Sequence, residues 1–262
     1  MLIERVWAAN DSRNFHYLVA CPETGEALAI DPLEWNLCLS VARERGWTIT
    51  QILNTHEHWD HTGGNAGLVG ATGAKLLAHA KAAAIIGGVD RGLAQGDVIR
   101  VGRTIEMECL DTPGHTLAHI CLYAHGDDPA LFSGDTLFNA GAGNCHSTGQ
   151  PQLLYASFAT QLARLPDSTR LFPGHEYLAR NLGFTLDREP ENQEAAQLLG
   201  SLSDSADQAP VTTLAQEKRI NTFFRLQNPR IIARLREQFP QWDLDPGPEA
   251  VFVKLRELRD AW

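Results

Sequence analysis

One short run, residues 55–61 (THEHWDH), constrains this sequence more than any other. It brings three imidazoles and a carboxylate close together, on His56, His58, Asp60 and His61. Imidazole and carboxylate are the ligands that divalent cations such as zinc take in proteins. A solvated polar turn accounts for one or two histidines, but crowding four titratable groups costs desolvation free energy unless something binds them. The run therefore predicts a metal site.

The flanking residues place this run at the end of a strand. Residues 48–54 (TITQILN) are apolar and β-branched, which is typical of a short buried strand. The glycine pair that follows, Gly63 and Gly64, precedes a stretch with helical bias. Open α/β sheets place their sites at the carboxyl ends of strands, so we expect the metal site at one edge of a sheet.

Three later loops repeat one pattern, in which an apolar strand ends and small residues precede a metal-ligand type. The loops contain TPGHT, SGDTLF and PGHEY and supply His115, Asp135 and His175. Glycine and proline let the backbone turn sharply enough to aim such a side chain across the sheet edge. Together with the first run they make up the candidate ligand set: His56, His58, Asp60, His61, His115, Asp135 and His175.

A set of this size exceeds what one tetrahedral ion needs and suits two. Two ions about 3.5 Å apart need a carboxylate between them, and such pairs activate water for hydrolysis. Asp135 is the candidate acid outside the first run, so we expect it to bridge, with Asp60 as the second carboxylate of the catalytic centre. We predict metal-assisted hydrolysis with two divalent cations, which could be zinc, iron or manganese, with zinc as the first choice.

The rest of the chain predicts a strand-rich part followed by a helical part. We expect strands at 2–7, 15–20, 26–31, 48–54, 75–79, 97–101, 104–110, 118–125, 130–138 (broken at Gly134 and Asp135) and 169–177. We expect helices at 34–46, 62–72, 80–87 and 151–164. Strand patterns end near residue 176, and the remainder is helical in bias. We therefore divide the chain into a catalytic domain, 1–176, and an α-helical segment, 177–262.

Composition limits the partners. The 262 residues carry a formal net charge of −10, which argues against a broad nucleic-acid or anionic-membrane surface. No window approaches the roughly 18 apolar residues of a membrane span, and the N-terminus has no apolar core of a signal peptide. The five cysteines form no CxxC pair, which favours reduced thiols and a cytoplasmic protein.

The motifs THEHWDH, TPGHT, SGDTLF and PGHEY, in this order, resemble the metallo-β-lactamase superfamily. The resemblance implies an α/β fold, an αββα sandwich with a dinuclear site along one edge, here with a mostly α-helical C-terminal segment. Within the superfamily the sequence is most similar to the glyoxalase II (hydroxyacylglutathione hydrolase) family. The specific marks are Trp59 and the stretches 171–192 (LFPGHEYLARNLGFTLDREPEN) and 217–225 (EKRINTFFR).

The same resemblance assigns each ligand. It implies a first ion on His56, His58 and His115, a second on Asp60, His61 and His175, and Asp135 between them. The implied reaction is hydrolysis of S-D-lactoylglutathione to D-lactate and glutathione. The expected partner is thus a small-molecule glutathione thioester, with no nucleic acid and no membrane, and the oligomeric state, monomer or dimer, stays open.

The resemblance also implies substrate contacts, and makes 177–262 a substrate-binding segment. Tyr177 matches a tyrosine that contacts glutathione, and Arg225 matches an arginine that binds the glycine carboxylate. In the loop 141–146, Asn144 replaces a basic residue and His146 an aromatic one, so we assign both to substrate binding.

The alternative functions are a hydrolase of a different thioester or of an acyl-homoserine lactone, and a mononuclear iron persulfide dioxygenase. The dioxygenase would not need the second ligand group.

Overall fold

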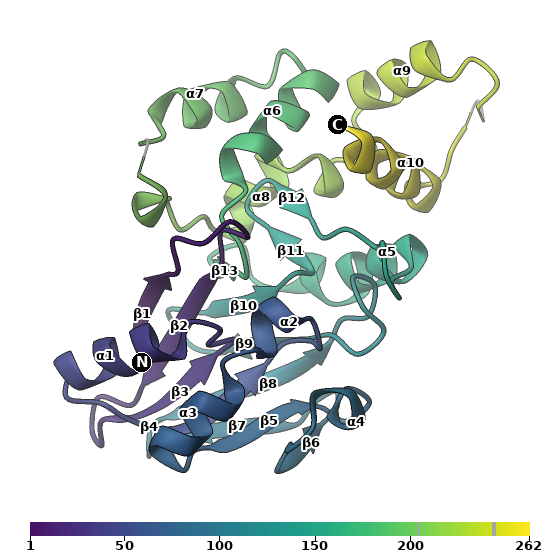
Figure 1. Ribbon diagram of the computed structural model, residues 1–262. Helices are drawn as coiled ribbons and strands as arrows, with labels where there is room; N and C mark the ends of the chain where they lie inside the picture. Colours follow the sequence, from purple (N-terminus) through teal and green to yellow (C-terminus); the bar gives the residue numbers. More distant parts are fainter. Residues whose placement is uncertain (204, 243–244) are drawn as a thin grey trace.

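The computed structural model of the protein describes residues 1–203, 205–242 and 245–262 (Figure 1). Its first sheet has six strands in the order β1-β2-β3-β4-β5-β6. The strands are β1 (Leu2–Trp7), β2 (Phe15–Ala20), β3 (Glu26–Ile30), β4 (Thr48–Asn54), β5 (Lys75–His79) and β6 (Arg91–Leu93). β1, β2 and β3 pair antiparallel, whereas β3 to β6 run parallel, so β4 and β5 end at the same edge.

The second sheet has five strands in the order β13-β10-β9-β8-β7. They are β7 (Val98–Val101), β8 (Ile105–Asp111), β9 (Ile120–Ala124), β10 (Ala130–Gly134) and β13 (Arg170–Pro173). β13 pairs parallel with β10 and the other pairs are antiparallel. A short hairpin of β11 (Leu137–Phe138) and β12 (Gly141–Ala142) follows β10.

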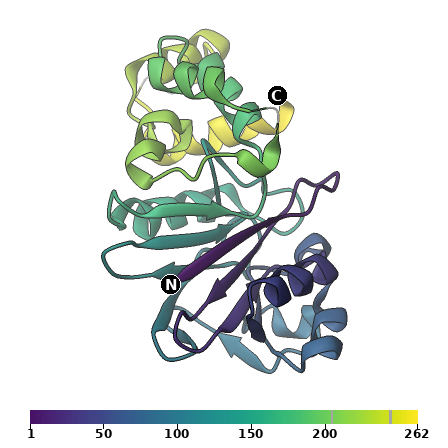
Figure 2. The same ribbon diagram turned by 90° about the vertical axis from the view of Figure 1, so that its left-hand side faces the viewer.

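Three hydrophobic cores lie between the layers of the sandwich. The two sheets face each other across one core, which includes Tyr17, Leu53, Ile99 and Phe132. A second core, with Cys38 among its members, packs α1 (Trp35–Glu44) and α3 (Asn65–Thr72) on the outer face of the first sheet. A third core packs α5 (Pro151–Thr160) and C-terminal residues on the outer face of the second sheet. The layers, seen edge-on in Figure 2, confirm the expected αββα sandwich.

The chain after β13 is helical and lies over one end of the sandwich, as Figure 2 shows. It contains α6 (Leu178–Arg188), α7 (Gln193–Ser201), α8 (Leu214–Ile220), α9 (Pro229–Gln238) and α10 (Pro248–Ala261), with single turns η2 (Ala206–Gln208) and η3 (Thr222–Phe224). α6, η3 and α10 pack beside the β11–β12 hairpin and α5. Among the described residues, no helix is both long and apolar enough to cross a bilayer.

The predicted elements are present, with the following corrections. The helix expected at 62–72 is α3, which begins at Asn65, and a separate turn that we did not predict, α2 (Trp59–Thr62), precedes it. The helix expected at 80–87 is the single turn α4 (Ala83–Ile86). The helix expected at 151–164 ends as α5 and a separate turn, η1 (Leu162–Arg164). We did not predict β6 and β12, which are three and two residues long, because such short strands carry no alternation of their own.

Candidate metal centre

The candidate ligands come from four turns that meet at one edge of the sandwich. His56 and His58 follow β4, Asp60 and His61 lie in α2, His115 lies between β8 and β9, Asp135 follows β10 and His175 follows β13. Their ligand atoms form three overlapping groups, and within each group the atoms lie within 4.8 Å of one another. The groups are His56, His58 and His115; His56, His61 and Asp135; and Asp60, His61 and His175. The structure therefore brings together all of the residues that we predicted as metal ligands.

The first group is a cluster of three imidazole nitrogens. His58 Nδ1 lies 3.0 Å from His56 Nε2 and 3.0 Å from His115 Nε2. One proton on His58 Nδ1 can satisfy one of these contacts and not both, so the other brings two lone pairs together. A cation between the three nitrogens removes this repulsion.

The second group adds carboxylates to imidazoles. His175 Nε2 lies 3.2 Å from His61 Nε2 and 3.4 Å from Asp60 Oδ2. Asp135 lies between the groups, with Oδ2 3.5 Å from His115 Nε2 and 3.2 Å from His175 Nε2, and Oδ1 3.4 Å from His61 Nε2. This is the position that a bridging carboxylate requires.

Hydrogen bonds made by Nδ1, the ring nitrogen that faces away from the centre, orient three of the imidazoles. His115 Nδ1 donates to the carbonyl of Asn144 at 2.7 Å, and His175 Nδ1 donates to the carbonyl of Ser12 at 2.7 Å. His61 Nδ1 donates to Asp31 Oδ2 at 2.9 Å. Each bond leaves Nε2 facing the centre, which is how metal-ligating histidines are held in proteins.

The pKa shifts differ in direction among the groups of this centre. Burial, with a contribution from the charge of His61, holds the pKa of His56 well below its usual value, so this imidazole is neutral. Burial also lowers the pKa of His61, but Asp135 and Asp31 outweigh it and raise the pKa to about 10. Burial raises the pKa of Asp135, yet His175 and His61 bring it well below the usual range. The centre therefore holds an anionic carboxylate among imidazoles.

The residues fit a pair of divalent cations. Asp135 Oδ1 is buried and has no hydrogen-bond partner among the described residues, which is costly for a carboxylate oxygen unless a cation takes its lone pairs. The donors are imidazole nitrogens and carboxylate oxygens, without a thiolate, a set that zinc, iron and manganese all accept.

Two residues that support the centre were not predicted. Asp31, in the left-handed region at φ 49°, accepts from the Thr55 amide at 2.8 Å and the Thr55 hydroxyl at 2.7 Å as well as from His61. His119 accepts from the Asp135 amide at 3.1 Å and stacks on His56 with centroids 5.2 Å apart. Each lies outside the four ligand motifs, so the sequence gives no signal for its role.

Two glycines are required by close approach at this site. Gly134 has φ +46°, and a Cβ there would lie 2.5 Å from Thr55 Oγ1. A Cβ on Gly174 would lie 2.4 Å from Asp135 Oδ1. Side chains at either position would displace Asp135 or its surroundings, so the small residues before Asp135 and His175 serve packing as well as turning.

A pocket adjoins the centre. It is lined by Phe138, Ala142, Asn144, His146, Tyr177, Arg180, Asn181, Arg256, Arg259 and Asp260. The Tyr177 ring stacks on His175, and the Asn144 carbonyl holds His115, so the pocket wall touches two of the candidate ligands. The structure thus brings Asn144, His146 and Tyr177, which we predicted to bind substrate, to the same place.

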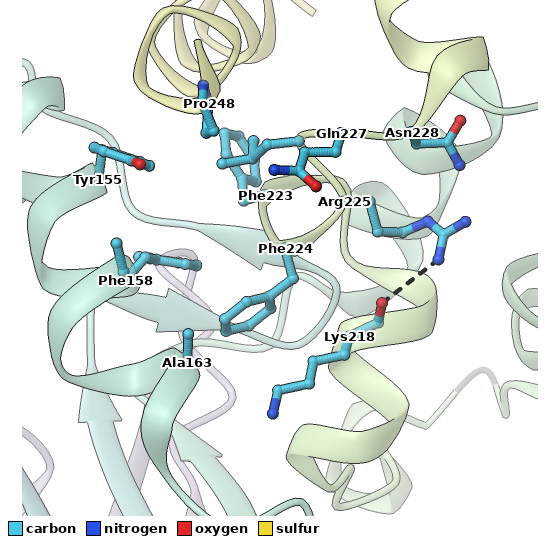
Figure 3. Close-up of a pocket in the computed structure, with 12 residues that line it drawn as sticks. Tyr155, Phe158, Ala163, Lys218, Phe223, Phe224, Arg225, Gln227, Asn228 and Pro248 are labelled. Atoms are coloured by element: carbon cyan, nitrogen blue, oxygen red, sulfur yellow. Dashed lines mark hydrogen bonds between the residues drawn. The ribbon is translucent and has the colours of Figure 1, made fainter.

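Arg225 lines a different pocket, shown in Figure 3 together with Phe158, Lys218 and Phe224. Its guanidinium pairs with Glu189, with Nε 2.8 Å from Oε2 and Nη2 2.5 Å from Oε1. The structure therefore does not bring Arg225 to the pocket beside the metal centre, and its predicted role in substrate binding stays a prediction.

Comparison with known proteins decides the family. Residues 19–175 match the model of the metallo-beta-lactamase superfamily, and residues 176–262 match that of the hydroxyacylglutathione hydrolase C-terminus. A hydroxyacylglutathione hydrolase of Polaromonas is 62% identical over 263 aligned positions, covering 100% of both chains. This chain belongs to the hydroxyacylglutathione hydrolase (glyoxalase II) family. The hydroxyacylglutathione hydrolase C-terminal model covers α6 to α10, and α6 and α10 line the pocket beside the metal centre.

Solved structures agree with the fold expected of a hydroxyacylglutathione hydrolase. ETHE1 from Myxococcus xanthus is 26% identical with a TM-score of 0.68, and the match covers 100% of this chain and 99% of that one. A structure described as TTHA1623 in a di-iron-bound form is 27% identical with a TM-score of 0.60, covering 84% and 99%. The predicted fold, a metallo-β-lactamase sandwich with a helical C-terminal segment, is confirmed.

Proposed function

We propose that this chain hydrolyses the thioester of 2-hydroxyacylglutathiones, with S-D-lactoylglutathione as the reference substrate, to a free hydroxy acid and glutathione. The observation that carries the proposal is the convergence of three ligand groups around Asp135 beside a pocket built by the family's C-terminal segment. The centre supports hydrolysis, and the pocket supports a substrate with a polar, anionic carrier.

The proposal assigns metal ligation to two groups. His56, His58 and His115 would hold one divalent cation, Asp60, His61 and His175 the other, and Asp135 would contact both. Two bound cations would supply an activated water and an electrophilic site for the thioester carbonyl. Zinc is our first choice, with iron or manganese as the alternatives, because the same nitrogen and oxygen donors accept all three.

The protein's own side chains would mostly position the acyl group. Phe138 and Tyr177 lie against His175, with ring centroids at 5.8 and 5.1 Å, and form an apolar wall beside the centre. A thioester is a reactive electrophile, so orientation and exclusion of bulk water account for much of what the protein must add. Asn144 and His146 line the same pocket and would contact the thiol carrier.

We also propose that residues 1–176 act as the catalytic unit and 177–262 as the substrate-binding segment. The pocket supports this division because Tyr177, Arg180, Arg256 and Arg259 all come from the second part. The cysteines are all unpaired, and four of them are buried, which supports a reducing compartment such as the cytoplasm.

The test is a comparison of substrates on the purified chain. We would measure kcat/KM for S-D-lactoylglutathione, an acyl-coenzyme A and an acyl-homoserine lactone. The proposal expects the glutathione thioester to be preferred by at least about tenfold, the equivalent of 1.4 kcal/mol in transition-state stabilisation. Equal turnover of the coenzyme A thioester, or preference for the lactone, would refute it in favour of the alternatives.

A further inference from the structure

The pocket beside the metal centre concentrates positive charge. Three arginines line it, Arg180 from α6 and Arg256 and Arg259 from α10, with Asp260 as its acidic residue. α6 and α10 lie side by side only in the folded chain, so no sequence motif joins these residues. The cavity is about 200 Å³.

Arg256 is occupied with the protein itself. Its Nη1 donates to the carbonyls of Ala142 and Gly143, at 2.6 and 3.2 Å, and its Nη2 pairs with Asp260 at 2.8 Å. Arg256 is buried, and it fixes the loop that carries Asn144. Its role is therefore to position this rim of the pocket.

The other two arginines have no carboxylate partner among the described residues. The Arg259 guanidinium meets Asn181 Oδ1, at 3.1 Å from Nη2 and 3.4 Å from Nε, and lies 5.7 Å from the centre of the Trp262 ring. Arg180 is exposed at the pocket and forms no ion pair with any residue that the structure describes. An unpaired guanidinium keeps its planar array of donors available to a ligand.

Mutual repulsion adds to this availability. Burial lowers the pKa of Arg259 to about 10, and the charges of Arg180 and Arg256 contribute in the same direction. Guanidinium groups gathered in this way are stabilised by an anion that binds between them.

The pocket is also correctly placed to receive part of a thioester whose acyl group lies at the metal centre. Tyr177 stacks on His175 with the ring planes 6° apart, and it lines the same pocket as Arg180 and Arg259. A cavity of this size is smaller than the roughly 300 Å³ at which small-molecule sites begin. It therefore suits one charged end of a substrate rather than the whole molecule.

We propose that Arg180 and Arg259 bind a carboxylate of the glutathione carrier and so select the thiol. The inference rests on the proposed function. Guanidinium is suited to this task because its forked donors match a carboxylate in geometry and charge. In this chain the two arginines would supply the positive charge that Asn144 lacks, while Arg225 is held by Glu189.

Glutathione offers two carboxylates, one on glycine and one on the γ-linked glutamate. Both are carboxylates at the ends of a flexible peptide whose thioester would lie at the metal centre, and guanidinium groups recognise either one by the same chemistry. The experiment must therefore include analogues that remove each one separately.

The test uses Arg180→Gln, Arg259→Gln and the double variant in the full chain, with Arg236→Gln as the matched control. Arg236 is exposed on α9 and lines none of the pockets described above, so its loss changes net charge alone. Thermal unfolding of each variant verifies that it is folded. Arg259→Lys, which keeps the charge but loses the fork, should restore part of the binding.

Two readouts are needed. Calorimetric titration with glutathione should show Kd raised at least tenfold in the double variant and unchanged in Arg236→Gln. In kinetics, KM for S-D-lactoylglutathione should rise at least tenfold with kcat within twofold, whereas kcat/KM for S-lactoyl-N-acetylcysteamine, which has no carboxylate, should stay unchanged.

The analogues identify the carboxylate. The kinetics are repeated with the glycinamide form of the substrate and with the form that lacks the glutamyl α-carboxylate. With one of these two analogues the double substitution should no longer raise KM. The carboxylate that this analogue lacks is the one that the arginines bind.

The outcomes separate the two proposals. If the wild-type chain turns over the glutathione thioester no better than the N-acetylcysteamine thioester, the proposed function fails and the inference falls with it. If the wild type prefers the glutathione thioester but the double variant keeps its Kd for glutathione, or loses activity equally on both thioesters, the arginine site alone is refuted.

Discussion

The ring of Tyr177 lies parallel to the imidazole of His175, with centroids 5.1 Å apart and planes 6° from each other. Both side chains donate to the same carbonyl, that of Ser12, at 3.1 Å from the tyrosine hydroxyl and 2.7 Å from His175 Nδ1. A candidate metal ligand and a pocket residue are thus held as one unit, two positions apart in the chain. This contact joins the candidate metal centre to the pocket that α6 and α10 line.

This unit predicts a difference between two substitutions at Tyr177. Tyr177→Phe keeps the ring on His175 and loses only a hydrogen bond, so KM and kcat should stay within about threefold of the wild type. Tyr177→Ala removes the apolar wall and should raise KM about tenfold, the equivalent of about 1.4 kcal/mol. Steady-state kinetics with S-D-lactoylglutathione measure both. Equal losses in the two variants would show that the hydroxyl, rather than the ring, is the important group.

Asp31 should control metal affinity without touching the metal. Its carboxylate accepts from His61 Nδ1 and from the hydroxyl and amide of Thr55. Asp31→Asn keeps the shape but places an amide beside donors, and loss of such an outer partner weakens metal binding by about 10–100-fold. Competition with a chelator would measure this. The control is Asp127→Asn, which changes an exposed carboxylate of the β9–β10 turn and should leave metal affinity unchanged. An unchanged metal affinity in Asp31→Asn would contradict the account.

Arg225 should contribute mainly to stability. Glu189 is 7% exposed at its side chain and accepts from two nitrogens of Arg225 and from Asn228. Arg225→Gln leaves this nearly buried carboxylate without its cation, which costs about 3 kcal/mol of unfolding free energy. Urea denaturation would measure the loss. If the variant instead keeps its stability and loses affinity for glutathione, Arg225 binds substrate as the family resemblance implies.

Glu217 predicts a pH dependence of stability. It is buried beneath the β11–β12 hairpin, and burial raises its pKa to about 7, although donors from Thr212, Asn221 and Ala140 partly oppose this. Because the pKa is higher in the folded state, the stability that Glu217 contributes is present at low pH and is lost as pH rises through 7. Between pH 5 and pH 8 the wild type should lose about 2–3 kcal/mol relative to Glu217→Gln. Parallel pH profiles of the two proteins would contradict this.

The candidate ligands could be predicted from sequence because their chemistry is dense and local. His56, His58, Asp60 and His61 crowd one turn, and His115, Asp135 and His175 each follow an apolar strand and small residues. Strand and helix patterns predicted most of the elements, except those too short to carry a pattern, such as β6 and β12, whereas the sandwich itself was implied by the family resemblance.

What could not be predicted depends on contacts between distant parts of the chain. Asp31 meets His61 only because β3 and β4 are neighbours in the sheet, and His119 reaches Asp135 only because β9 lies beside β10. Arg180 and Arg259 are ordinary helix charges until α6 and α10 pack at one pocket. The spacing of residues along the sequence does not show which distant residues become neighbours in the fold.

The central claim is that two divalent cations, shared through Asp135, form the catalytic centre. The most direct measurement is the metal content of the purified, active chain by mass spectrometry, set beside that of Asp135→Asn and related to the hydrolysis rate of S-D-lactoylglutathione. We predict two ions per chain in the wild type and a hydrolysis rate that rises with the second ion. Asp135→Asn should lose both the two-ion content and this activity. One ion per chain at full activity would contradict the account.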